Sequence, residues 1–143
     1  MSPSNISSDD KLFVQSRAHF CCEYCWSQEK YSPTSFSIEH IAPQSQGGSH
    51  HVDNLAYACQ GCNNFKYTHT MAYDPVTGRQ VMLYNPRQHV WSSHFKWSED
   101  YSLLVGVTAI GRATISKLKL NRTNLVNLRK LLVTVEEHPP ISE

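Results

Sequence analysis

Four cysteines in two close pairs are the residues whose types and spacing most directly predict chemistry. Cys22 and Cys25 form one Cys-x-x-Cys pair, and Cys59 and Cys62 form the other. Two thiolates two residues apart can bind one ion from a single tight turn, and two such pairs are the ligand set of a tetrahedral zinc site. The gap between the pairs is longer than in a usual zinc ribbon, so we expect a folded hairpin inside it. Cys21 could compete with Cys22, but Cys22 keeps the two-residue spacing, so Cys21 is expected to be a small buried residue.

Three strings within and after this gap carry a resemblance to a known family. They are EHIAPQSQGG, which begins at Glu39, then NL at Asn54, and CQGCNNFK, which begins at Cys59. Together they resemble the HNH nucleases, whose core is two strands and a helix that bind one catalytic metal. The resemblance covers residues 22–66 directly. It implies an α+β fold with a small ββα-metal core fastened by the four-cysteine zinc site, followed by an α+β C-terminal extension.

The resemblance also implies a role for each polar residue of these strings. Phosphodiester hydrolysis needs a nucleophilic water, a cation over the phosphate and stabilisation of the leaving 3′ oxygen. His40, with an unperturbed pKa of about 6.5, is the expected general base. Glu39 and Asn63 offer the oxygen ligands that Mg²⁺ or Mn²⁺ prefers, and Glu39 stands where the family more often has Asp. By resemblance, Asn54 ties down the loop and orients His40.

A metal-dependent HNH endonuclease is therefore the function that the resemblance implies, cutting DNA to leave 5′-phosphate and 3′-hydroxyl ends. We expect double-stranded DNA as its partner. One alternative is a zinc-stapled nucleic-acid-binding module without catalysis, and another is a structural zinc domain that serves as an interaction platform. Loss of His40 or Asn63 would favour the binding module, and both residues are present.

Basic residues gather in the second half of the chain, although the net charge is only +1. Residues 101–130 contain no acidic residue and these basic ones: Arg112, Lys117, Lys119, Arg122, Arg129 and Lys130. The candidate DNA contacts among them are Arg112, Lys117, Lys119 and Arg122, and the alternative is a solvated helix face. Lys66 in the core is either a solvated lysine or a phosphate contact.

The other seven histidines carry no comparable pattern. An ordinary surface or hydrogen-bonded role is expected for five of them: His19, His50, His51, His89 and His138. His69 and His94 could approach the site, but a surface role is expected for both.

The spacing of apolar and turn-forming residues predicts strand, loop, strand and helix in the core. The expected elements before residue 70 are a helix from Ser7 or Ser8 to about His19, strands at 36–41 and 55–58, and a helix at 59–69. Those after it are a strand at 81–84, a short helix from Asn85-Pro86 to about 93, strands at 95–97 and 103–107, a helix at 111–118 capped by Thr108, and a helix from Asn121 to about 135. We expect one HNH domain over residues 1–143, with its core at about 20–70 and its extension at about 71–143.

Composition bounds the class of protein. Charged residues make up 17% and apolar residues 40% of the chain, which is typical of a globular protein. Cysteines in metal spacing, rather than in a disulfide framework, indicate a reducing compartment. The N-terminus is polar and acidic, without the pattern of a secretory signal, and the apolar stretch at 103–110 is too short to span a bilayer. We therefore expect a cytoplasmic protein with no membrane partner.

Overall fold

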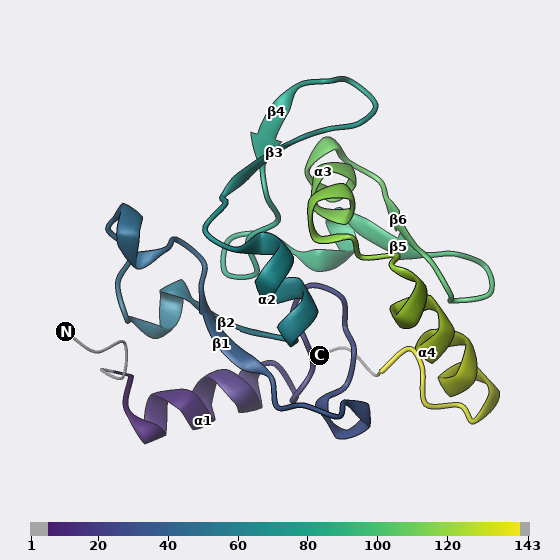
Figure 1. The fold of residues 1–143 in the computed structure, drawn as a ribbon, viewed down its shortest axis with the longest axis horizontal. Coiled ribbons are helices and arrows are strands. Elements are labelled where there is room, and N and C mark those ends of the chain that lie inside the picture. The colour runs from purple at the N-terminus through teal and green to yellow at the C-terminus, as the bar shows by residue number, and fades with distance from the viewer. Residues whose placement is uncertain (1–5, 141–143) are drawn as a thin grey trace. The chain divides into compact units, whose positions relative to one another are not determined.

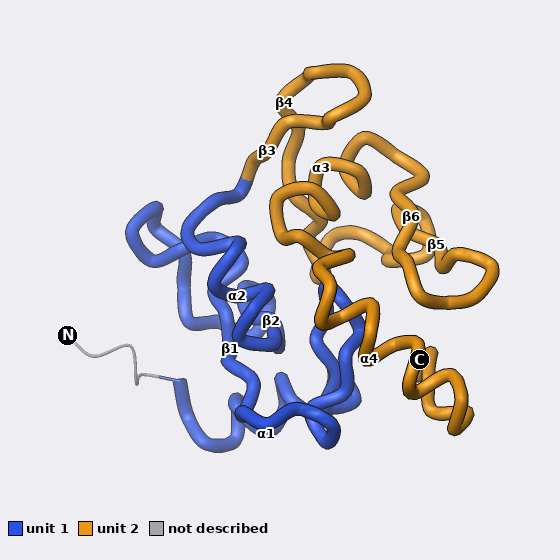
Figure 2. Tube along the Cα trace, turned by 45° about the vertical axis from the view of Figure 1, so that its right-hand side comes forward, with its two compact units in different colours: residues 1–70 blue, residues 71–143 orange. Residues whose placement is uncertain are grey.

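Residues 6–140 are described by a computed structural model, in which the chain divides after residue 70. Figure 2 shows the two units, residues 1–70 and residues 71–143. The division falls where the predicted core meets the predicted extension. Each unit combines helices with small two-stranded sheets, so the predicted α+β class is confirmed. That the two units work as a single domain stays a prediction.

The first unit begins with helix α1, Ser8–Arg17. Ser7 caps it by accepting a 3.0 Å hydrogen bond from the Asp10 amide, as the serine and acidic residues at this end predict. Val14 is fully buried on the side of α1 that packs against the second strand. The helix ends two residues before the predicted His19, which has a φ of +55° and turns the chain toward the first cysteine pair.

Strands β1, Ser37–His40, and β2, Leu55–Ala58, form an antiparallel hairpin. In its register Glu39 lies opposite Ala56, and His40 lies opposite Leu55. All four residues of β2 are buried, whereas β1 buries only Glu39. Because successive side chains of a strand point to opposite faces, Glu39 faces inward and His40 does not.

Helix α2, Gln60–Lys66, follows β2 directly and lies beside the hairpin in Figure 1. Its N-cap is Cys59, whose sulfur accepts a hydrogen bond from the Cys62 amide. The helix is shorter than the predicted 59–69, because Tyr67 leaves helical geometry with a φ of +51°. Strand, loop, strand and helix nevertheless follow in the order that the sequence predicts.

The second unit contains two hairpins and two helices among its described residues. Its elements are β3 Met71–Tyr73, β4 Gln80–Met82, β5 Phe95–Trp97, β6 Leu104–Gly106, α3 Ala109–Leu118 and α4 Thr123–Thr134. β3 pairs with β4 and β5 pairs with β6, both antiparallel. Thr108 caps α3 as predicted, by accepting from the Gly111 amide. Strand β3 was not among the expected elements, and it is only three residues long.

Two asparagines that were predicted to start helices instead form hydrogen bonds outside any helix. Asn85 accepts from the backbone amides of Arg87 and Gln88, which closes a turn, so the predicted helix from 85 to 93 is wrong and only a 3-10 turn forms at Trp91–Ser93. Asn121 bonds both backbone groups of Leu104, and α4 therefore begins only at Thr123.

A buried arginine organises the interior of the second unit. Arg129 of α4 is 3% exposed and donates to the carbonyl oxygens of Ser102 and Leu120. Its guanidinium also lies over the ring of Trp97, 5.2 Å from the centroid. Arg129 is thus a structural residue, unlike the exposed Lys130 beside it. No helix in the described part of the chain is both long and apolar enough to cross a membrane.

Candidate functional site

The four paired cysteines converge on one point. The sulfurs of Cys22, Cys25, Cys59 and Cys62 all lie within 4.8 Å of one another, and all four residues are buried. Cys22 and Cys25 come from the turn before β1, whereas Cys59 and Cys62 come from the first turn of α2. Cys21 lies outside this cluster and its thiol donates to the carbonyl oxygen of His19. The open choice between Cys21 and Cys22 is therefore settled in favour of Cys22.

The cluster fits a tetrahedral zinc ion. Zinc–sulfur bonds of about 2.3 Å at tetrahedral angles place neighbouring sulfurs about 3.8 Å apart. The sulfurs of Cys25 and Cys59 are separated by 3.8 Å. Burial raises the pKa of the Cys22 thiol well above its usual value, while a hydrogen bond from Cys22 lowers the pKa of Cys59. Buried thiols held this close need a cation if all four are to ionise, and a bound zinc ion would supply that charge.

Asn54 fastens the loop that follows β1. Its side chain accepts from the Ala42 amide at 2.9 Å and donates to the carbonyl oxygens of Ala42 and Ser49 at 3.0 and 2.8 Å. Gly48 passes so close that an added Cβ would lie 1.7 Å from the Ala42 oxygen. A side chain at position 48 would therefore force the loop apart. These bonds are consistent with the loop-holding role that the resemblance implies for Asn54.

His40 lies at the end of β1, where the loop begins, and is half-buried. Its Nε2 is 3.0 Å from Nδ1 of His50. Burial lowers the pKa of His40, and the neighbouring His50 lowers it further. His40 is therefore largely neutral at pH 7, which is the state that a general base requires.

His50 is the residue of this site that sequence reasoning missed. We expected an ordinary surface histidine, but the structure brings it to His40, with ring centroids 5.1 Å apart. The available signal was its position just after Gly47-Gly48, where the loop reverses and brings its second half back toward β1.

Glu39 is held in a buried network. Its two carboxylate oxygens accept from the Tyr24 hydroxyl at 2.6 Å and from Nζ of Lys66 at 2.5 Å. Nζ of Lys66 also donates to the carbonyl oxygen of Ile41 at 3.0 Å. Glu39 is 4% exposed and Lys66 is 1% exposed. Burial raises the pKa of the Glu39 carboxyl, and the Lys66 charge opposes that rise.

This network corrects two expectations. Lys66 was weighed as a solvated lysine or a phosphate contact, and the structure places it in neither position, because its ammonium is enclosed by the protein. Glu39 was expected to bind the catalytic cation, but both of its carboxylate oxygens already accept hydrogen bonds, one from the Tyr24 hydroxyl and one from the ammonium of Lys66. Asn63 is half-buried, and its side chain forms no hydrogen bond among residues 6–140. Of the two predicted ligands, Asn63 has a side-chain oxygen without a hydrogen bond among the described residues, and Glu39 could join it at a cation only if Lys66 moved away.

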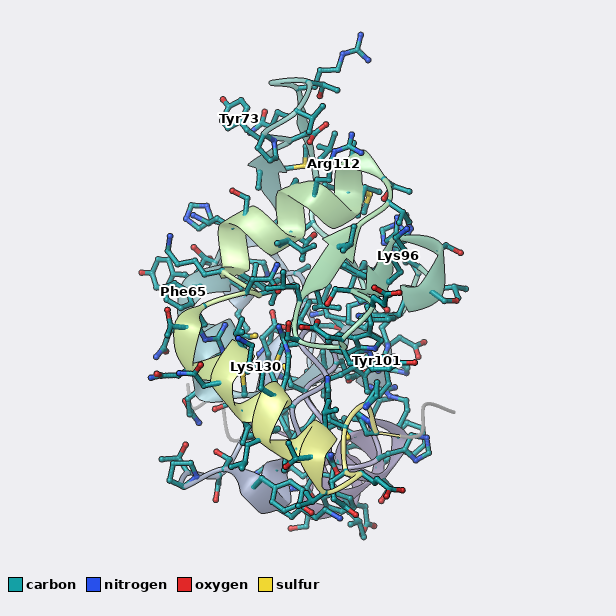
Figure 3. The ribbon with its side chains drawn as sticks, turned by 90° about the vertical axis from the view of Figure 1, so that its right-hand side faces the viewer. Phe65, Tyr73, Lys96, Tyr101, Arg112 and Lys130 are labelled. Atoms are coloured by element: carbon teal, nitrogen blue, oxygen red, sulfur yellow. The ribbon has the colours of Figure 1, made fainter. Side chains whose placement is uncertain are left out.

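The candidate DNA contacts of the second unit differ in their surroundings. Arg112 on α3 forms a two-pronged ion pair with Asp74, which is 0% exposed, through bonds of 2.9 Å each. Arg122 donates to carbonyl oxygens at the end of α3. Lys117 is half-buried and Lys119 is exposed. Figure 3 shows Arg112 on α3 and Lys130 on α4. A structural role thus accounts for the Arg112 side chain, whereas Lys119 has the exposure that a phosphate contact requires.

The geometry of the first unit can be compared with known proteins. Neither the search of curated proteins nor the search of solved structures returned a match. Residues 22–68 match the family model described as HNH endonuclease. The matched segment starts at the first zinc cysteine and contains His40, Asn54 and Asn63. Residues 22–68 of this chain therefore match an HNH endonuclease domain, which suggests a nuclease-type family, and they contain a four-cysteine site compatible with zinc.

Proposed function

We propose that the chain is an endonuclease that hydrolyses phosphodiester bonds of double-stranded DNA, with His40 as the general base. The observation that carries the proposal is the placement of His40 at the edge of a zinc-fastened hairpin, half-exposed and with a lowered pKa. Asn54 supports it by holding the loop beside His40 on both sides. The family match to residues 22–68 indicates a nucleic-acid substrate.

In the proposed reaction, His40 takes a proton from a water molecule that attacks the phosphorus. The water oxygen bonds to the phosphorus as the bond to the 3′ oxygen breaks, and the 3′ oxygen takes a proton from solvent, which leaves a 5′-phosphate and a 3′-hydroxyl end. A divalent cation such as Mg²⁺ or Mn²⁺, when bound, would neutralise charge on the phosphate. Asn63 is the residue with an available oxygen for it, and Mg²⁺ usually keeps several waters and completes its shell with substrate phosphate. Glu39 becomes a second ligand only if the ammonium of Lys66 leaves its oxygen.

Binding to the DNA backbone is proposed to use basic residues of the second unit. Lys119 is the best placed by exposure, with Lys117 and Arg122 beside it along the end of α3. Contacts of this kind position the duplex without reading its sequence, and they weaken as salt rises.

A second candidate function is a nucleic-acid-binding module without catalysis. One observation favours it: Glu39 and Lys66 form a buried ion pair, which is typical of a structural rather than a catalytic carboxylate. The zinc site would be structural under both proposals, because four thiolates leave no open position on the ion.

Cleavage of supercoiled plasmid separates the two. The zinc-loaded protein is incubated with Mg²⁺ or Mn²⁺, and the His40→Ala variant is compared with His51→Ala, which removes an exposed histidine from the same loop. Nicking by the wild type and His51→Ala, with loss of roughly 10²–10⁴-fold in His40→Ala, is the expected result. Equal activity in all three proteins would exclude His40 as the base. A protein that shifts DNA in a gel but never cuts it would support the binding module.

A further inference from the structure

Three side chains of the first unit lie in a line from the proposed base to the surface. His40 Nε2 is 3.0 Å from His50 Nδ1, and His50 Nε2 is 3.2 Å from the side-chain amide nitrogen, Nε2, of Gln44. Gln44 is exposed, while both histidines are half-buried. Nδ1 of His40 has no hydrogen-bond partner among residues 6–140.

This line couples the protons of the two rings. A neutral imidazole carries one N–H donor and one acceptor nitrogen, so the contact between His40 and His50 can be made in only two ways. If His50 donates, His40 must carry its proton on Nδ1, and neither nitrogen of His40 can then accept a proton from water. If His40 donates from Nε2, its Nδ1 is an unprotonated nitrogen with no partner. Only this second arrangement makes His40 a base.

The second arrangement also determines the tautomer of His50 and the orientation that the Gln44 amide must adopt. His50 accepts at Nδ1 and must therefore carry its own proton on Nε2, which faces Gln44. That proton needs an acceptor. The Gln44 side chain places its amide nitrogen, a donor, 3.2 Å from His50 Nε2, so it supplies an acceptor only after its amide turns and brings the oxygen to the ring. A half-turn of the amide exchanges nitrogen and oxygen, and this side chain is exposed and free to make that turn.

We propose that His50 is a positioning residue of the nuclease site, which accepts the Nε2 proton of His40 and is itself held by the oxygen of Gln44. His50 thereby fixes both the ring orientation and the tautomer in which Nδ1 of His40 takes the proton from water. This inference rests on the proposed function, because it gives His40 the role of general base. The loop keeps the pair together through the bonds of Asn54 to Ala42 and Ser49 on either side of Gln44.

The hydrogen bond is tested first by NMR, without any assay of activity. The zinc-loaded full chain, labelled with ¹⁵N-histidine and free of DNA and divalent cations, is examined for nitrogen–nitrogen coupling across the contact. The expected result is coupling between His40 Nε2 and His50 Nδ1 with the proton on His40. A proton found on His50 Nδ1, or the absence of coupling, would overturn the proposal. Because cleavage is not measured, this result stands even if the proposed function fails.

Cleavage kinetics test the role. His50→Ala should lower kcat by roughly tenfold or more while KM stays within about twofold, a smaller loss than that of His40→Ala. His50→Asn keeps an oxygen close to the former Nδ1 position, so it should recover most of kcat. His51→Ala is the matched control and should behave as the wild type. The proposal is refuted if His50→Ala keeps full kcat while His40→Ala is inactive, or if His50→Asn is as impaired as His50→Ala.

Discussion

Replacing Lys66 by methionine tests whether the buried network is as the structure places it. The variant keeps most of the aliphatic stem but removes the ammonium that bonds Glu39 and the Ile41 carbonyl. We expect the free energy of unfolding of the first unit to fall, because a carboxylate and a carbonyl oxygen are left buried without their donor.

The size of the effect follows from the bonds that are lost. A hydrogen bond to a charged group contributes about 1.5–3 kcal/mol, and a buried acceptor left unsatisfied costs about 1–3 kcal/mol. Their sum agrees with the cost of about 3–5 kcal/mol for breaking a buried ion pair. Burial already raises the pKa of Glu39, so this carboxyl can take up a proton and limit the loss. We therefore expect about 3 kcal/mol, near the lower end.

Zinc release during urea unfolding is the assay, because all four zinc cysteines belong to the first unit. With a urea dependence of about 1–3 kcal/mol/M, the midpoint should fall by about 1–3 M. Lys130→Met removes an exposed lysine and is the matched control, with an expected change within about 0.5 kcal/mol. Adding Glu39→Gln to Lys66→Met should recover part of the loss, since the buried charge is then gone. If Lys66→Met unfolds like the wild type and instead loses DNA affinity, Lys66 is a phosphate contact and our reasoning on the network is wrong.

Two further predictions concern single polar side chains. Asn54→Ala removes three hydrogen bonds worth about 0.5–1.5 kcal/mol each, so it should speed amide hydrogen exchange over residues 42–50 and abolish most cleavage. Asn64→Ala, which removes an exposed asparagine, should do neither. Unchanged hydrogen exchange in Asn54→Ala would contradict the proposal that Asn54 holds the loop. The bond from Arg112 lowers the pKa of the Asp74 carboxyl, so its contribution to stability is present above the unfolded pKa of about 3.9 and is lost as the pH falls through and below that value. Between pH 6 and pH 3 the second unit should therefore lose more stability with Asp74 present than in Asp74→Asn. Unfolding of this unit is followed by the fluorescence of Trp91 and Trp97, with Trp26→Phe in both proteins. Parallel curves of stability against pH would refute this account.

The features that could be predicted from the sequence are those whose cause is local. The Cys-x-x-Cys spacings predict a zinc site because each pair closes within one turn, and the observed cluster of four sulfurs is compatible with zinc. Ser7 and Thr108 cap helices as expected because each reaches an amide three residues ahead. Asn85 and Asn121 misled the prediction for the opposite reason. Their side chains are equally suited to caps, and only the folded chain decides that one closes a turn and the other bonds Leu104, seventeen residues away.

The pairings within the candidate site are non-local, and the alternation of β1 decides them. The strand turns Glu39 inward, where it meets a lysine from the end of α2 and a tyrosine from the zinc turn, 27 and 15 residues away in the sequence. It turns His40 the other way, toward the loop that carries His50. Two adjacent residues that look like one catalytic pair in the sequence thus belong to different environments: Glu39 is buried in an ion pair, and His40 is half-exposed. A shift of β1 by one residue would exchange them, placing the imidazole in the core and the carboxylate at the surface. The bonds of Glu39 to Tyr24 and Lys66 prevent that shift, so the buried carboxylate stabilises the register that keeps His40 accessible.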